Sequence, residues 1–252
     1  MLATAVKAAR SAGRLMAERY PDRQEVTVKG YRDIVTETDT AAESIILRMI
    51  GERFPDHHIV SEEKGGDEWG NGYAWIVDPL DGTTNYAHHL PVFCVSIGVL
   101  EEGVPLLGVV YDPLLDQIFV AERGEGASLN GAPIHASDVT EVRKAVISLD
   151  WAHSDAVRAQ SLAVLNRLAL ECRTVRALGS AALALAYVSA GWLDAYYNLA
   201  LKPWDSAAGC LLITEAGGRC TDMSGGTYSV NMPDCVASNG GIHEKLLHLI
   251  GR

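Results

Sequence analysis

Acidic side chains recur at the ends of apolar runs, and at one of these places their spacing suits a site for a divalent cation. Residues 78–84, Asp-Pro-Leu-Asp-Gly-Thr-Thr, directly follow the apolar run 74–77. Pro79 keeps the residue before it extended, and Gly82 permits a close backbone approach or a positive φ. Both aspartates and the Leu80 carbonyl can therefore face one point and offer the oxygen ligands that Mg²⁺ prefers. For this segment alone, an acidic surface turn is the alternative interpretation.

Three further segments place carboxylates beside predicted strands or helix starts. They are 33–39 (Asp-Ile-Val-Thr-Glu-Thr-Asp), 61–63 (Ser-Glu-Glu) and 204–209 (Trp-Asp-Ser-Ala-Ala-Gly). Strand ends are where α/β proteins assemble their sites. The amides of Gly82, Thr83 and Thr84 can also point at an anion, as at the start of a helix, so that one short loop can hold metal and phosphate together. The spacing of an EF-hand and the G-x-x-x-x-G-K motif of a P-loop are absent from the sequence, which excludes those two classes.

Composition and charge narrow the classes of protein further. The chain has 252 residues, 48% of them hydrophobic, and 21 basic against 32 acidic side chains give a net charge of −11. This is globular composition, and its acidic balance suits the binding of cations rather than nonspecific binding of nucleic acid. The sequence shows no signal peptide and no apolar stretch near the roughly 20 residues that span a membrane. The five cysteines form no C-x-x-C pair, so we expect reduced thiols in a cytoplasmic protein with neither nucleic-acid nor membrane partners.

The elements that must position these carboxylates fall into two halves, residues 1–139 and 140–252. In the first half the pattern predicts a helix over the first twenty residues and a second helix capped by Thr38 or Asp39. Short strands at 25–29, 34–36, 58–60 and 74–77 and a β-rich block at 92–100, 106–111, 117–121 and 127–129 complete this half. In the second half, predicted strands at 145–149, 174–175, 193–197 and 236–237 alternate with predicted helices at 154–170, 180–189, 205–216 and 242–250. We therefore expect an α+β half that carries most metal ligands and an α/β half that completes the site, packed tightly together.

Taken in order, these segments resemble the signatures of the inositol monophosphatase family. Residues 78–85 resemble its D-P-[IL]-D-G-T-x-N motif, and 204–209 resemble its W-D-x-A-A-G motif. Glu62-Glu63 matches the G-E-E position, with Ser61 in place of the usual glycine. Residues 33–39 match D-x-V-T-x-x-D, and 179–182 look like the G-[ST]-A-A start of a helix. The resemblance covers essentially the whole chain, and the five motifs together are highly specific.

The resemblance implies a Mg²⁺-dependent, often Li⁺-sensitive phosphomonoesterase with a layered αβαβα sandwich fold, usually a homodimer. It assigns the first Mg²⁺ to Glu62, Asp78 and the Leu80 carbonyl, and the second to Asp78, Asp81 and Asp205. A third, weaker ion would sit near Glu62. The attacking water would be oriented by Thr83, whose hydroxyl contacts Asp39. The implied substrate contacts are Asp81, Gly82, Thr83, Thr84, Ser180, Ala181, Asn198 and Asp205.

Several of these residues have a plainer interpretation. Asp39, Ser180 and Asp205 could each act only as a helix cap. Glu63 could be an ordinary surface carboxylate or a support for the site, and the sequence leaves that choice open.

The substrate is the least determined part of the prediction. Inositol-hydrolysing relatives often carry a glutamate where this chain has Asn198, and a neutral amide accepts hydrogen bonds from hydroxyls less strongly than a carboxylate. We expect hydrolysis of inositol 1-phosphate, with fructose-1,6-bisphosphatase or histidinol-phosphatase activity as the alternatives on the same scaffold. A non-catalytic, divalent-binding regulator is the alternative from another class. A decayed site should have lost one of its ligands, yet all of them are present: Glu62, Asp78, Asp81, Thr83 and Asp205.

Overall fold

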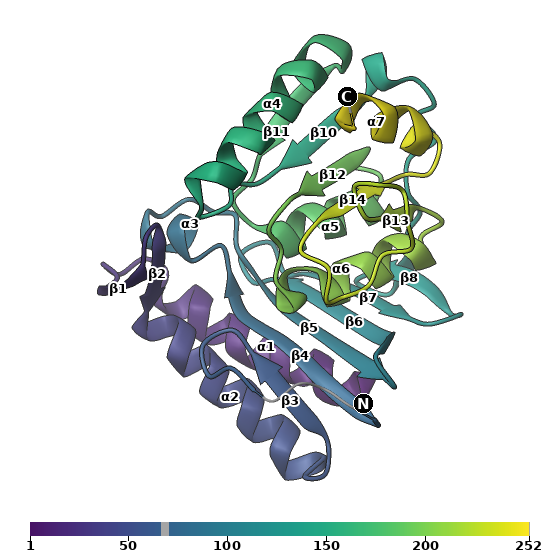
Figure 1. Ribbon diagram of the computed structural model, residues 1–252. Helices are drawn as coiled ribbons and strands as arrows, with labels where there is room; N and C mark the ends of the chain where they lie inside the picture. The colour runs from purple at the N-terminus through teal and green to yellow at the C-terminus, as the bar shows by residue number, and fades with distance from the viewer. Residues whose placement is uncertain (67–70, 252) are drawn as a thin grey trace.

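Helices and sheets alternate in five layers in the computed structural model, which describes residues 1–66 and 71–251 (Figure 1). The order of the layers is α-β-α-β-α. The outer helices on one side are α1 (Leu2–Arg19) and α2 (Glu37–Arg53), and those on the other side are α4 (Asp155–Glu171) and α7 (His243–Ile250). The central layer holds α5 (Ala181–Ser189) and α6 (Pro203–Glu215). This is the layered sandwich that the resemblance to the inositol monophosphatase family implies.

The first sheet has seven strands in the order β3-β4-β5-β6-β7-β8-β9. Its strands are β3 (His58–Ser61), β4 (Tyr73–Asp81), β5 (Cys94–Glu101), β6 (Val104–Asp112), β7 (Gln117–Glu122), β8 (Gly126–Leu129) and β9 (Ala132–Pro133). Only the β3–β4 pair is parallel, so both of these strands end at the same edge of the sheet. A short hairpin of β1 (Val26–Gly30) and β2 (Asp33–Thr36) precedes α2, and α3 (Thr83–Ala87) follows β4.

The second sheet has five strands in the order β11-β10-β12-β14-β13. Its strands are β10 (Val146–Leu149), β11 (Thr174–Ala177), β12 (Ala195–Asn198), β13 (Arg219–Thr221) and β14 (Cys235–Ser238), and the 3₁₀ turn η1 (Val142–Lys144) leads into it. Strand β10 is parallel to both of its neighbours. The carboxyl ends of β10 and β12 therefore lie at one edge of this sheet, next to each other.

Glycines on the first sheet allow α6 to pack unusually close to it. A Cβ atom on Gly98 of β5 would lie 2.8 Å from the Ala207 Cβ, and one on Gly108 of β6 would lie 2.7 Å from the Ala208 carbonyl oxygen. Neither contact leaves room for a larger side chain. This packing fixes the start of α6, and with it Asp205, against the seven-stranded sheet.

The predicted boundary lies between the two sheets, because the first ends at Pro133 and the second begins at Val146. The halves share a buried cluster in which Val110 and Phe119 of the first sheet contact Leu183 and Leu212 of the central helices. The division at residue 139 is a proposal about folding units, and this shared core supports the expectation that the halves pack together.

The start of α2 corrects one detail of the sequence prediction. The N-cap is Thr36, whose hydroxyl accepts a hydrogen bond from the Thr38 amide, and Asp39 at the third helical position completes a capping box. Neither Thr38 nor Asp39 is the cap, because both already have helical backbone. Strand β13 and helix α3 were also absent from the prediction.

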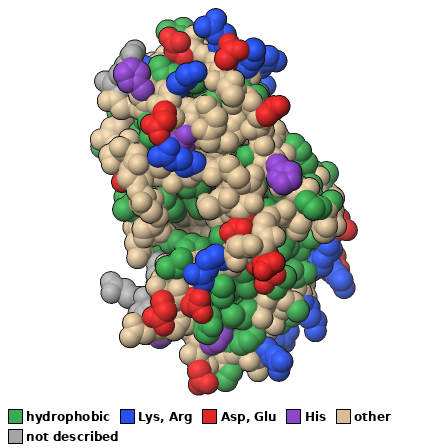
Figure 2. All heavy atoms as spheres, turned by 90° about the vertical axis from the view of Figure 1, so that its right-hand side faces the viewer, with side chains coloured by type: hydrophobic (Ala, Val, Ile, Leu, Met, Phe, Trp, Pro, Cys, Tyr) green, Lys and Arg blue, Asp and Glu red, His purple; other side chains and the backbone are tan. Residues whose placement is uncertain are grey.

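The surface charge and the length of the helices bear on the environment of the protein. On the face of the molecule in Figure 2, Lys and Arg side chains are interspersed with Asp and Glu side chains. Among the helices of residues 1–66 and 71–251, none is long and apolar enough to cross a membrane.

Candidate active site

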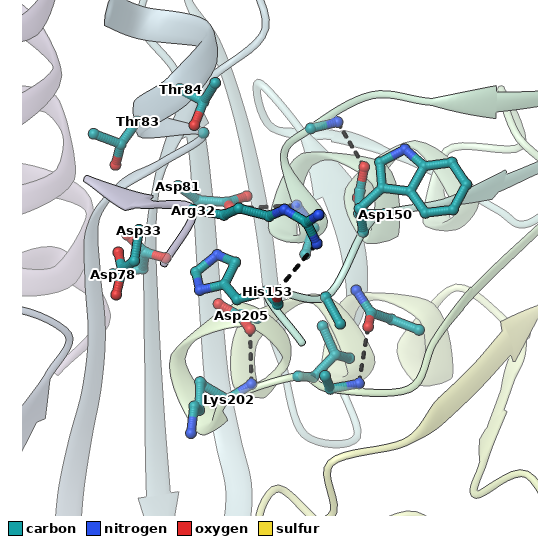
Figure 3. Close-up of a pocket in the computed structure, with 18 of the residues that line it drawn as sticks. Arg32, Asp33, Asp78, Asp81, Thr83, Thr84, Asp150, His153, Lys202 and Asp205 are labelled. Carbon is teal, nitrogen blue, oxygen red and sulfur yellow. Dashed lines mark hydrogen bonds between the residues drawn. The ribbon is translucent and has the colours of Figure 1, made fainter. Parts of the chain in front are cut away.

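A pocket of about 1030 Å³ opens where the strand ends of the two sheets face each other. Both halves of the chain line it, together with the β1–β2 hairpin (Figure 3). The lining residues come from the segments 29–34, 78–85, 150–154, 177–181 and 198–205, together with Glu62 directly after β3, Val157 and Arg158 of α4, and Pro233. All five motif segments therefore contribute to one cavity. The segment Glu62-Glu63 does so through Glu62, directly after β3.

Three carboxylates meet in this pocket. Asp78 and Asp81 lie at the end of β4, Asp205 lies in the first turn of α6, and one oxygen of each is within 4.8 Å of the other two. The pairing of β4 with β5 is irregular between Asp78 and Asp81. Because strict alternation would send residues three apart to opposite faces, this irregularity lets both side chains turn to the same point.

Burial makes the cluster unfavourable unless a cation joins it. Asp78 is 2% exposed and Asp81 8% exposed. Burial, reinforced by the neighbouring carboxylates, raises the pKa of Asp78 and of Asp205 well above the usual range. Burial also raises the pKa of Asp81, which hydrogen bonds from the start of α5 partly offset. No Lys or Arg within the described residues pairs with any of the three. An all-oxygen, anionic donor set of this kind fits a hard divalent cation.

Glu62 stands beside the cluster, where β3 ends next to β4. Its amide donates to the Val77 carbonyl at 3.1 Å, and this hydrogen bond holds residue 62 beside strand β4. Burial raises the pKa of Glu62 to about 7, and Lys29 at 3.4 Å works against that rise. Lys29 also pairs with Glu63 at 2.7 Å. Glu63 therefore anchors the lysine of the β1–β2 hairpin beside Glu62.

Thr83 and Asp39 are in direct contact although they lie on different helices. The Thr83 hydroxyl lies 2.8 Å from Asp39 Oδ1 and 3.1 Å from the Leu80 carbonyl oxygen. Asp39 is fully buried, and its Oδ2 accepts hydrogen bonds from the Thr36 amide at 2.9 Å and the Thr36 hydroxyl at 2.5 Å. Asp39 therefore both completes the capping box of α2 and holds the Thr83 hydroxyl at the pocket wall.

The expected substrate contacts divide into two groups. Gly82, with φ 98°, and Thr84 line the pocket at the start of α3. By contrast, the Ser180 hydroxyl donates to Asp81 Oδ2 at 2.5 Å, and the Ala181 amide donates to Asp81 Oδ1 at 3.3 Å. These two residues hold a carboxylate of the cluster in place.

Asn198 lines the pocket, but its side-chain amide is engaged within the protein. Its Nδ2 donates to the Tyr196 hydroxyl at 3.0 Å, and its Oδ1 accepts from the Ala200 amide at 2.9 Å. The hydrogen-bonding capacity that remains for a substrate is therefore smaller than the sequence alone indicates.

The structure also brings in residues that the motifs did not select. Arg32, at the tip of the β1–β2 hairpin, pairs with Asp155 at 2.8 Å and donates to the His153 carbonyl at 3.3 Å, which ties the hairpin to the second half. Asp150 lies in the wall directly after β10, and burial raises its pKa to about 7. The signal for Asp150 was present in the sequence, since a carboxylate follows the predicted strand 145–149. Arg32 had no such signal.

Comparison with known proteins agrees with this geometry. The sequence profile of the inositol monophosphatase family matches residues 1–252. The Nus factor SuhB of Escherichia coli (strain K12) is 41% identical over 251 residues, which cover 98% of this chain and 94% of that protein.

Two solved structures share the fold. The extragenic suppressor protein suhB from Bartonella henselae has a TM-score of 0.94 and 35% identity, and covers 100% of this chain and 98% of its own. SaIMPase-II with inositol monophosphate bound, from Staphylococcus aureus, has a TM-score of 0.83 and 27% identity, and covers 98% of this chain and 92% of its own. The chain therefore belongs to the inositol monophosphatase family, and it is a phosphoric monoester hydrolase.

Proposed function

We propose that this protein hydrolyses inositol 1-phosphate with Mg²⁺ as its cofactor. The observation that carries the proposal is the convergence of Asp78, Asp81 and Asp205 within 4.8 Å, next to the Thr83–Asp39 hydrogen bond. Two Mg²⁺ ions would be held by Asp78, Asp81, Asp205, Glu62 and the Leu80 carbonyl, with a third near Glu62. When bound, Mg²⁺ lowers the pKa of coordinated water and neutralises charge on the leaving oxygen.

The protein's own groups supply orientation. The Asp39 carboxylate accepts a hydrogen bond from the Thr83 hydroxyl, which leaves the Thr83 oxygen lone pairs free to accept a hydrogen bond from the attacking water. The amides at the start of α3 have no partners within their own helix, and Gly82, Thr83 and Thr84 line the pocket, so these amides can bind the phosphate oxygens. Ser180 and Ala181 keep Asp81 in its productive orientation through their hydrogen bonds.

The choice of inositol 1-phosphate is supported by the relative with inositol monophosphate bound, SaIMPase-II. Fructose 1,6-bisphosphate is the second candidate because Lys29, Arg32, Arg158 and Lys202 line the same pocket and could meet a second phosphate. Histidinol phosphate is retained from the sequence as a third candidate. Relatives named Nus factor SuhB carry a name that specifies no phosphatase activity, but the complete set of acidic ligands favours catalysis over a purely regulatory role.

The experiment that tests this proposal measures phosphate release from four esters: inositol 1-phosphate, fructose 1,6-bisphosphate, histidinol phosphate and phenyl phosphate. We expect release with Mg²⁺, less than 1% of that rate after chelation, and the highest kcat/KM for inositol 1-phosphate. Asp205→Asn should lose most activity, whereas Asp138→Asn, at an exposed carboxylate outside the pocket, serves as its control. Release that is independent of Mg²⁺ would refute the cofactor, and a higher kcat/KM for another ester would refute the substrate.

We also propose a Li⁺-sensitive homodimer, as the resemblance implies. Trp192 is 48% exposed although its ring packs 5.1 Å from that of Tyr187, and homodimer interfaces bury apolar surface of this kind. Sedimentation at low micromolar concentration should give twice the chain mass, and a monomer would contradict the proposal.

A further inference from the structure

One carboxylate in the pocket wall, that of Asp150, is not among the residues expected to hold metal or orient water. Asp150 Oδ1 accepts a hydrogen bond from the Gly179 amide at 2.6 Å. Asp150 Oδ2 is buried and has no hydrogen-bond partner. Within the described part of the chain two other buried side-chain oxygens share this condition, on Asp112 and Gln117, and neither lines the pocket. Because buried acceptors are normally paired, an unpaired one in a binding pocket indicates a donor that comes with the ligand.

The backbone fixes Asp150 relative to the metal-binding residues. Gly179, which donates to Asp150, has φ 77° and packs so closely that a Cβ there would lie 2.8 Å from Asn85 Nδ2. The next residue, Ser180, donates to Asp81. One short segment therefore holds both Asp150 and Asp81, and the distance between them cannot change freely.

Asp150 also lies where the alcohol half of a substrate has to be. Figure 3 shows Asp78, Thr83 and Thr84 on one side of the pocket and Asp150 on the other. A phosphate bound at the carboxylate cluster and the start of α3 directs its ester group away from them, toward the wall that carries Asp150.

The hydrogen bonds of Asn198 also favour Asp150 as the acceptor of the substrate hydroxyls. Its amide is bonded to Tyr196 and Ala200, so it is not the free acceptor of the alcohol half. The Tyr196 hydroxyl lies close enough to lower the pKa of Asp150, but burial has the larger effect and raises that pKa to about 7. The anionic acceptor that residue 198 lacks is thus present on the neighbouring strand segment, directly after β10 instead of at the end of β12.

We infer that Asp150 determines substrate specificity: its carboxylate accepts hydrogen bonds from free hydroxyl groups of a polyol or sugar phosphate. The inference rests on the proposed phosphatase function and deepens it by naming the class of alcohol. A hydrogen bond to a carboxylate is about twice as strong as one to a neutral acceptor. An ester that carries hydroxyl groups should therefore bind more tightly than one without them. The competing assignment makes Asp150 a structural link to Tyr196, with no contact to substrate.

The test pairs one substitution with two substrates of the same ring size. Wild-type protein, Asp150→Asn and the control Asp138→Asn are assayed with inositol 1-phosphate and with cyclohexyl phosphate, whose ring has no hydroxyls. We expect Asp150→Asn to raise KM for inositol 1-phosphate about tenfold and KM for cyclohexyl phosphate less than twofold, with kcat little changed. Asp138→Asn should change neither. If Asp150→Asn does not fold, Asp150→Ser replaces it with the same expectation.

A stability measurement separates the specificity role from the structural one. Because Asp150→Asn removes a buried unpaired charge, the melting temperature at pH 8 should not fall. A fall in melting temperature together with equal changes in KM for both esters would assign Asp150 to the structural link and overturn the inference alone. Wild-type protein that releases phosphate from neither ester, nor from phenyl phosphate, would overturn the proposed function and the inference with it.

Discussion

The Thr83 hydroxyl lies 2.8 Å from Asp39 Oδ1, and this contact joins the first turn of α3 to the first turn of α2. Asp39 is fully buried and is also hydrogen-bonded by Thr36. A carboxylate held in this way has one geometry available, so the Thr83 hydroxyl is oriented before any substrate binds. Such preorganisation is what a residue that orients water requires.

Thr83→Ala should therefore act on the rate rather than on binding. We expect kcat for phosphate release to fall about 10²-fold and KM to change less than about twofold, because the phosphate is held elsewhere. Thr40→Ala is the matched control, since Thr40 lies in α2 on its exposed side and bonds only the Glu37 carbonyl. A tenfold rise in KM with unchanged kcat would show that Thr83 binds substrate instead.

Asp39→Asn should affect both activity and stability. It weakens the capping box of α2, which contributes on the order of 1 kcal/mol, and it disturbs the Thr83 hydroxyl. We expect a lower melting temperature than for Thr83→Ala, and a loss of kcat in the double variant well below the product of the two single losses. Thermal melts and single-turnover rates of the three variants test this. Losses that multiply fully would leave Asp39 as a helix cap only.

Mg²⁺ should stabilise the protein, and more so at higher pH. Burial raises the pKa of Asp78, Asp81 and Asp205 above their unfolded values, so the stability they contribute is present below about pH 4 and is lost as pH rises through the folded pKa values. Glu62, with a pKa of about 7, extends this loss to neutral pH. Mg²⁺ binds the ionised forms, so its increase in melting temperature should be larger at pH 8 than at pH 5.5. Asp205→Asn should shrink the increase, and an increase that does not depend on pH would contradict the prediction.

Acid should destabilise the second half through His243. This imidazole is fully buried between Thr221 and Ser238, and burial lowers its pKa to about 4. The unfolded chain takes up the proton at about pH 6.5, so stability is lost as pH falls from 6.5 toward 4. We expect His243→Gln to be less sensitive than wild type to a change from pH 7 to pH 5, by about 1 kcal/mol in the free energy of unfolding. Urea unfolding at the two pH values measures this, and equal sensitivity would show that His243 is protonated in the fold.

The close packing of α6 should be necessary for metal binding. Gly108→Ala places a methyl group against the Ala208 backbone, which should cost about 1–3 kcal/mol and move Asp205 away from β4. Gly51→Ala, where nothing lies within 4 Å of the added Cβ, is the control and should not destabilise. Mg²⁺ titrations followed by melting temperature should show weaker binding for Gly108→Ala only. Unchanged Mg²⁺ affinity would mean that the helix can shift without moving Asp205.

The convergence of Asp78 and Asp81 could be predicted from the sequence because local chemistry determines it, whereas metal binding by these residues stays a prediction. Pro79 and Gly82 constrain the 78–84 segment whatever surrounds it, and the strand before it is strongly apolar. The layered fold followed from the resemblance and from the change of pattern near residue 140. The three-residue strand β13 was missed, since Arg219-Cys220-Thr221 has no apolar alternation and pairs only because β14 lies beside it.

Residue contacts across the chain were harder to predict. Contact of Ser180 and Ala181 with the substrate stays a prediction, whereas their hydrogen bonds to Asp81, which lies about a hundred positions earlier, could not be predicted from the sequence. The prediction for Asn198 considered only its residue type. Whether its side chain can bind a substrate also depends on its hydrogen bond to Tyr196. Asp150 could have been found by the rule that selected Asp78, because both directly follow a buried strand.

The central claim is that Asp78, Asp81 and Asp205 jointly hold divalent cations. The most direct measurement is an anomalous difference map from crystals grown with Mn²⁺ in place of Mg²⁺. We predict at least one strong peak in contact with all three carboxylates, and its loss in Asp205→Asn. An active enzyme whose map shows no peak at these carboxylates would contradict the claim.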